Sequence, residues 1–145
     1  MINATFDFLD PVNQFIEIAP DCPLKQAVVP PKKGTRQTVA TIEYELLSKK
    51  PYVYTLQELK FTTHVQQKQI SPLEVKTQRK QLLQDFLGKP YACMRASPLT
   101  RQYGWGAHYN EEGKIAIYAV GSKDYLRLVV DDSIKKYAAM RSKRE

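Results

Sequence analysis

The 145-residue chain has few of the features that narrow a protein's class at once. Its two cysteines, Cys22 and Cys93, lie far apart, so we expect reduced thiols rather than a disulfide framework. Its apolar runs are too short to form a membrane-spanning helix. No basic residue precedes Lys25, whereas a secretory signal begins with positive charge and continues with a long apolar stretch. These absences predict a cytoplasmic protein that does not associate with a membrane.

The composition is that of an ordinary globular protein. Hydrophobic residues make up 43% and charged residues 26% of the chain, which excludes disordered, collagen-like and fibrous proteins. The length corresponds to one domain. We therefore expect a single domain over residues 1–145, with residues 1–12 loosely ordered and residues 141–145 forming a basic tail.

Positive charge is concentrated in the second half of the chain. The sequence has 22 basic and 15 acidic residues, a net charge of +7. Residues 1–24 include four acidic residues and no basic one, whereas residues 73–145 include fourteen basic and eight acidic residues. Such an excess attracts anionic partners over a long range. The alternative is a solvated surface that only keeps the protein soluble.

The first half of the chain alternates strand-like and helix-like patterns. Short runs of alternating apolar residues are typical of half-buried strands, and three-to-four spacing is typical of amphipathic helices. Prolines and a glycine mark the surface loop between the first strand and the first helix. In order, these patterns predict a strand at residues 13–19, a loop at 20–34, a helix at 38–49, a capped turn at 55–58 and a strand at 60–67.

The second half contains the clearest helix start and the clearest hairpin. Ser71 can cap a helix, Pro72 suits its first position, and Gly88 is expected to end it in a left-handed conformation, with Pro90 beyond. Mixed helices and strands joined by a hairpin predict a single α+β domain. We expect a mainly antiparallel sheet with a central hairpin and two to four packed helices. The predicted elements are a helix at residues 71–87, a strand at 91–95, a hairpin at 105–109 and 114–120, a helix at 123–130, and a strand or a helix at 134–140.

Residues 95–109, RASPLTRQYGWGAHY, combine arginines, hydroxyls, aromatic rings and glycines in one short segment. Arginine presents a planar set of donors that suits phosphate or carboxylate, and aromatic faces can stack on a base or another ring. This segment therefore predicts a cleft for an anionic ligand. The candidate binding residues are Arg95, Ser97, Thr100, Arg101, Tyr103, Trp105 and His108, joined by Lys32 and Lys33 of the proline-rich loop.

The same segment also has a purely structural interpretation. Trp105 can anchor the core of the hairpin, Arg95 can pair with a carboxylate such as Glu17, and the glycines can serve only the turn. Strand alternation from Trp105 places Tyr109 on the same face of the sheet and His108 on the other.

Three hypotheses for function follow. The first is a non-catalytic module that binds a phosphorylated small molecule or a nucleic acid through the segment 95–109. The second is a small enzyme that grips an anionic substrate with Arg95 or Arg101 and uses His108, Tyr103 or Cys93 as acid, base or nucleophile. The third is a structural protein, such as a homodimer that buries an aromatic patch.

No known catalytic or cofactor motif supports the enzyme hypothesis. The two histidines and two cysteines lack the close spacing of a metal site, so we expect no metal. Ser97 lacks the setting of a hydrolase nucleophile, and the single glycine of PPKKG does not form a phosphate-binding loop. We therefore expect no cofactor.

Five segments resemble a family of small, uncharacterised bacterial proteins classified as a domain of unknown function. They are FIEIAPDCP at residues 15–23, VPPKKG at 29–34, RASPLTRQYGWGAHY at 95–109, EEGKIAIY at 111–118 and AMRSKR at 139–144. The resemblance covers nearly the whole chain beyond its first dozen residues. It implies a bacterial, cytoplasmic, stand-alone domain, and it assigns no activity and no catalytic residue.

Overall fold

A β-hairpin forms where the sequence predicts it and supplies two of the four strands of the sheet. Strands β2 (Trp105–Tyr109) and β3 (Ile115–Ala119) pair antiparallel, with Trp105 opposite Ala119 and Tyr109 opposite Ile115. The side chain of Asn110 closes the turn, because its Oδ1 accepts hydrogen bonds from two turn amides. The structure is a computed structural model that describes residues 11–32, 34 and 37–141.

Two further strands complete a four-stranded sheet in the order β3-β2-β1-β4. Strand β1 (Gln14–Glu17) pairs antiparallel with β2, and β4 (Lys135–Ala138) pairs parallel with β1. The structure thus confirms a single α+β domain with a mainly antiparallel sheet, and the β1–β4 pair makes the sheet mixed. Residues 134–140, which the sequence left open between strand and helix, include the strand β4. Because β1 and β4 are parallel, their carboxyl ends lie at the same end of the sheet.

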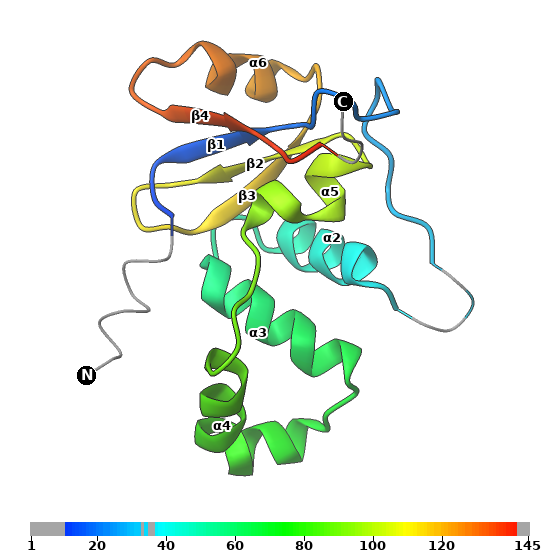
Figure 1. Ribbon diagram of the computed structural model, residues 1–145, viewed down its shortest axis with the longest axis vertical. Helices are drawn as coiled ribbons and strands as arrows, with labels where there is room; N and C mark the ends of the chain where they lie inside the picture. Colours follow the sequence, from blue (N-terminus) through cyan, green and yellow to red (C-terminus); the bar gives the residue numbers. More distant parts are fainter. Residues whose placement is uncertain (1–10, 33, 35–36, 142–145) are drawn as a thin grey trace.

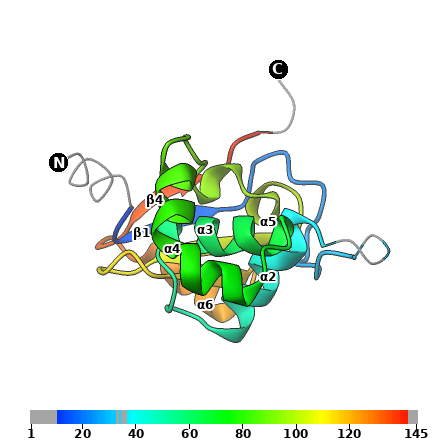
Figure 2. The ribbon, with the colours of Figure 1, turned by 90° about the horizontal axis from the view of Figure 1, so that it is seen from below.

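Helices cover both faces of the sheet (Figure 1). Helix α6 (Lys123–Val130) packs on one face, as the sequence predicts. Helices α2 (Val39–Lys49) and α5 (Pro98–Arg101) pack on the other face, and α3 (Leu56–Gln67) packs against α2. Helix α4 (Pro72–Leu87) is the outermost layer and lies farthest from the sheet, as the view from below shows (Figure 2).

Strand alternation divides the core into two parts. Ile16 and Tyr109 belong to the larger core beneath α2, α3 and α5. Phe15 belongs to the smaller core beneath α6, where its ring meets the edge of Tyr125 at 5.0 Å between centroids. Gly106 makes this contact possible, because a Cβ atom there would lie 2.6 Å from both rings. The two faces of the sheet are therefore distinct environments.

The predicted strand at residues 60–67 is wrong, because these residues belong to α3. Thr55 and Glu58 form the predicted capping box, but the helix that they start continues to Gln67. Leu56, Leu59 and Thr63 are buried on the helix face that packs against α2. The three-to-four spacing that begins at Leu56 outweighs the short alternation from Phe61.

The predicted strand at residues 91–95 is also wrong. Residues Met94–Ala96 form a short 3-10 helix, η1, which leads into α5. The amide of Met94 donates to the hydroxyl of Tyr109 at 3.0 Å instead of joining a strand ladder. Pro90 and Pro98 flank this segment and disfavour a regular strand, since proline lacks the amide that a ladder requires.

The longest helix begins and ends at the predicted residues, with the predicted cap at its start and a different conformation at its end. Ser71 accepts a hydrogen bond from the amide of Glu74, and the helix ends at Leu87. Gly88 is right-handed, with a φ of −70°, which corrects the expected left-handed stop. Its amide still donates to the carbonyl of Gln84, and the amide of Lys89 donates to the carbonyl of Phe86. The helical hydrogen bonding thus continues up to Pro90, which has no amide hydrogen to donate. No helix in the described ranges is long and apolar enough to span a membrane.

Candidate functional site

Three segments that are distant in the sequence meet at the carboxyl ends of β1 and β4. The amide of Ala139 donates to the carbonyl of Glu17, and the amide of Met140 donates to the carbonyl of Arg95. The amide of Ala19 donates to the carbonyl of Thr100. The parallel pairing of β1 and β4 thus brings the segments 15–23, 95–101 and 137–141 together.

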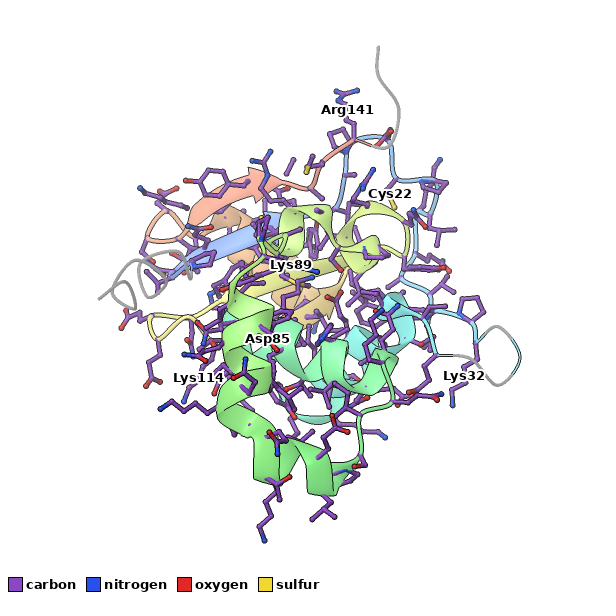
Figure 3. All side chains as sticks on the ribbon, turned by 60° about the horizontal axis from the view of Figure 1, so that its bottom comes forward. Cys22, Lys32, Asp85, Lys89, Lys114 and Arg141 are labelled. Carbon is purple, nitrogen blue, oxygen red and sulfur yellow. The ribbon has the colours of Figure 1, made fainter. Side chains whose placement is uncertain are left out.

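We call this region the C-terminal corner and define it by its solvent-facing and partly exposed side chains. In Figure 3 the labelled Arg141 and Cys22 lie at the same end of the molecule. The members of the C-terminal corner are Arg95, Arg101, Tyr137, Met140 and Arg141.

Arg95 lies exposed on the edge of the sheet beside β4. Its Nε donates to the carbonyl of Ala138 at 2.9 Å, and its guanidinium lies 5.9 Å from the ring centroid of Tyr137. Within the described part of the chain, no hydrogen-bond acceptor is assigned to its two terminal nitrogens. Arg95 is therefore fixed in place through one N–H and retains donors that a ligand can use.

Arg101 reaches the same segment from α5. Its Nη2 lies 3.4 Å from the carbonyl oxygen of Arg141, which makes a long hydrogen bond. Its Nε is buried and has no hydrogen-bond partner among the residues that the structure describes. An unmatched buried donor costs about 1–3 kcal/mol or more, so an acceptor supplied by a ligand would be favourable here.

Tyr137 and Met140 make the C-terminal corner partly apolar. Their exposed fractions are 39% and 50%. Tyr137 lies opposite Ile16 in the β1–β4 register, so its ring is on the sheet face that also carries the larger core. Glu17 lies one position further along β1 and is therefore on the α6 face. No acidic side chain of β1 or β4 thus lies on the face that carries Tyr137.

Ser97 and Thr100 are buried and satisfied within the protein. Ser97 Oγ donates to Glu43 Oε1 at 2.7 Å and accepts from the amide of Leu99 at the start of α5. Thr100 Oγ1 donates to the carbonyl of Met94 at 2.6 Å. These two hydroxyls hold η1 and α5 in place and so position Arg95 and Arg101.

A buried ion pair contacts Ser97 at the start of α5. Glu43 of α2 is fully buried, and its Oε2 lies 2.6 Å from Nζ of Lys60 on α3. With Ser97, this pair links α2, α3 and α5, and we call the three residues the buried polar cluster. The sequence analysis missed it, although a glutamate between Ile42 and Tyr44 on the apolar side of a helix is the signal that could have revealed it.

Trp105 and Tyr103 hold the proline-rich loop instead of the C-terminal corner. Trp105 Nε1 donates to the carbonyl of Val28, and its ring packs at 5.3 Å from Tyr44. The carbonyl of Tyr103 accepts from the amide of Val28. Gly104, with a φ of +81°, permits this approach, because a Cβ atom there would lie 3.0 Å from the backbone of the loop.

His108 lies on the opposite face of the sheet from Trp105, as alternation predicts. Its Nδ1 is 2.8 Å from the hydroxyl of Tyr52, which is 2.7 Å from the hydroxyl of Tyr118. Burial, and then the positive charge of Arg127, lower the pKa of His108 below its ordinary value. Burial, with the hydrogen bond between the hydroxyls of Tyr52 and Tyr118, raises the pKa of Tyr52 above its usual range. Both shifts favour the uncharged forms of His108 and Tyr52.

The remaining predicted residues do not join the C-terminal corner. Lys32 lies 3.8 Å from Glu45 of α2, and Figure 3 shows it well separated from Arg141. Lys33 lies outside the described residues. The structure thus brings Arg95 and Arg101 together and separates them from Trp105, His108 and Lys32.

The cysteines and the histidines show no further site. Cys22 and Cys93 are free and half-buried, and both pack against the larger core. Cys93 precedes η1, and the thiol of Cys22 lies 3.7 Å from the carbonyl oxygen of Leu24. Over the described ranges, no three His, Cys, Asp or Glu side chains are grouped to hold a metal ion.

The fold and the C-terminal corner define a small α+β domain with a basic surface at the end of its sheet. Residues 8–145 match the family of unknown function DUF6157, so the chain belongs to that family. The match confirms the family resemblance of the sequence. No curated protein and no solved structure matches the chain.

Proposed function

We propose that the protein is a non-catalytic module that binds an anionic ligand at the C-terminal corner. One observation carries this proposal: the guanidinium groups of Arg95 and Arg101 approach the same four-residue segment, 138–141, and among the residues that the structure describes each keeps N–H donors without a hydrogen-bond acceptor. A planar guanidinium binds phosphate or carboxylate through parallel hydrogen bonds, which are stronger than bonds between neutral groups.

The surrounding charge supports an anion rather than a neutral ligand. Lys135 and Arg141 are exposed at the two ends of the segment that contains β4. The sequence continues beyond Arg141 with Lys143 and Arg144. Basic groups gathered in one region raise the local concentration of anions and speed their association.

The geometry favours a binding module over the enzyme hypothesis. An enzyme that used Arg95 to hold a substrate and His108 to move a proton would need both groups at one place. The two lie on different parts of the domain, because His108 is on the α6 side of the sheet with Tyr52 and Tyr118. Ser97, the nearest hydroxyl in sequence to Arg95, is buried and bonded to Glu43.

The expected compartment is part of the same proposal. Two unpaired cysteines are typical of a reducing environment, which supports the cytoplasm. The resemblance of the sequence to small bacterial proteins supports a bacterial origin.

Inorganic polyphosphate tests this proposal, since it offers phosphate charge without bases or sugars. We expect the protein to bind it at low salt and to release it as the salt concentration rises, because binding displaces counterions. Arg95→Ala should weaken binding and flatten the salt dependence. Lys80→Ala is the matched control, because it removes one positive charge from the exposed surface of α4, far from β4 (Figure 1). Equal losses in the two variants, or no binding at low salt, would overturn the proposal.

A further inference from the structure

We propose that the ligand of the C-terminal corner is single-stranded nucleic acid, with one base stacked on the ring of Tyr137 and its phosphates held by Arg95, Arg101 and Lys135. This inference rests on the proposed anion-binding function and adds the class of ligand to it.

The ring of Tyr137 is the first reason. It lies on a strand at the edge of the sheet, it is 39% exposed, and it has a guanidinium on one side. Tyrosine rings at interfaces with single-stranded nucleic acid stack on unpaired bases, and every base has a face suited to this contact. A ligand that consists of phosphate alone makes no use of the ring.

The linear arrangement of the charges is the second reason. Lys135 and Tyr137 are two residues apart on one strand, so their side chains share a face at a spacing of about 6.6 Å. Arg95 lies beside Tyr137, and Arg141 follows at the end of the segment. A row of exposed cations next to an aromatic ring suits an extended polyanion, which gains from several weak contacts at once.

The exposure of these side chains disfavours a small phosphorylated metabolite. Small ligands bind in hollows that bury most of their surface. Arg95, Lys135, Tyr137, Met140 and Arg141 are all exposed along one edge of the domain. A polymer that lies across this edge needs no enclosed hollow.

The distribution of acidic groups agrees with a polymer that lies along the β4 edge of the sheet. Glu17, the acidic residue of β1, is on the α6 face, and Gln14 and Ile16 are on the face of Tyr137. A nucleic acid strand that lies along the edge strand β4 beside Tyr137 therefore meets no acidic side chain of β1 or β4 on that face.

Fluorescence anisotropy with a labelled oligothymidylate of roughly twelve nucleotides tests this inference. An oligouridylate of the same length shows whether a ribose backbone changes the affinity. An abasic strand of equal length and a duplex serve as comparison ligands. We expect tighter binding to the base-bearing single strands than to the abasic strand or the duplex. Tyr137→Ala should weaken binding to the base-bearing strand about tenfold and leave the abasic strand unchanged, whereas Tyr137→Phe should keep most of the affinity.

The outcomes of these experiments distinguish the nucleic-acid inference from the proposed anion-binding function. Equal affinity for the base-bearing and abasic strands, or no effect of Tyr137→Ala, overturns the nucleic-acid inference while polyphosphate binding keeps the anion-binding function. Tighter binding to the duplex also overturns the inference. Absence of binding to every polyanion at low salt overturns both. A thermal melt of Tyr137→Ala confirms that the variant is folded before its affinity is compared.

Discussion

The buried polar cluster and the C-terminal corner use similar groups in opposite ways. In the cluster, Glu43 and Lys60 form an ion pair that is shielded from water, and Ser97 satisfies the second carboxylate oxygen. In the C-terminal corner, Arg95 is exposed and donates a hydrogen bond to the carbonyl of Ala138. The comparison shows that a short stretch of chain, residues 95–101, supplies both a structural anchor and a surface for binding.

The difference between the two regions lies in the solvent around the charges. A buried charge must be paired, so losing its partner is costly, and the pair fixes the geometry around it. An exposed charge is already solvated by water and contributes little to stability. We therefore expect substitutions in the cluster to affect folding and substitutions in the C-terminal corner to affect binding.

Glu43→Ala is expected to have the largest effect on stability. It leaves the ammonium of Lys60 partly buried and without its carboxylate, and breaking such a pair costs about 3–5 kcal/mol. Urea unfolding followed by circular dichroism measures the loss. Glu45→Ala on the same helix is the control, because its contact with Lys32 is exposed and its loss should cost about 0.5 kcal/mol or less. Similar losses for both variants would remove the distinction between buried and exposed pairs.

Ser97→Ala should have a smaller effect. It removes the cap of α5 and the hydrogen bond to Glu43, and leaves one buried carboxylate oxygen unmatched, at a cost of about 1–3 kcal/mol. The same unfolding experiment measures it. The double variant with Glu43→Ala should lose less stability than the sum of the two single losses, since both substitutions remove the same contact. Strict additivity would show that the hydroxyl and the carboxylate act independently.

The stability of the protein should fall as the pH falls through about 6.5, the ordinary pKa of histidine. Burial lowers the pKa of His108 in the folded state, so the unfolded chain takes up its proton at a higher pH and is favoured. His108→Gln should reduce this pH dependence.

Asp131 affects stability in a lower pH range. Hydrogen bonds from Ser133 lower its pKa, so its contribution to stability disappears only near or below pH 3.8.

A chemical-denaturation series from pH 8 to pH 5 measures the effect of His108. A steeper loss of stability in His108→Gln than in the wild type would contradict the assignment. The half-buried group of Tyr52, His108 and Tyr118 thus provides an intermediate case between the shielded cluster and the exposed corner.

Arg95→Ala should have the smallest effect on stability, within about 0.5 kcal/mol, because the side chain is exposed and has a single neutral acceptor. Its effect should appear in binding, where the slope of log affinity against log salt falls by about 0.7–0.9 for one lost phosphate contact. A thermal melt and a salt titration with labelled oligothymidylate measure the two quantities. A large drop in melting temperature with an unchanged salt slope would assign Arg95 to the structure instead of the site.

Much of the fold follows from local patterns. The hairpin at residues 105–119 and the helix at 123–130 have strong alternation and capping, and both form where the sequence predicts them. The strand predicted at 60–67 failed because Phe61, Thr63 and Val65 alternate over a short distance within a longer helical pattern. Short windows contain both periods, and the packing of Leu56 and Leu59 against α2 adds to the helical spacing and the cap at Thr55.

The candidate site was predicted in part. Residues 95–101 stand out in the sequence through their density of arginines and hydroxyls, yet the hydroxyls turn inward and the arginines stay near the surface. Tyr137 and the carbonyls of residues 138 and 141 were not expected there, because the parallel pairing of β1 and β4 joins segments more than a hundred residues apart.

The sequence by itself determined the class of the domain, its basic second half, its hairpin and its family. These properties depend on composition and on spacings of a few residues, which a chain carries whatever its long-range contacts. Only the tertiary structure decided that Arg95 meets Tyr137, that Arg101 reaches the carbonyl of Arg141, and that Glu43 pairs with Lys60. Such contacts depend on strand order and on the burial of charge, which have no local signature because they arise when distant segments exclude water together.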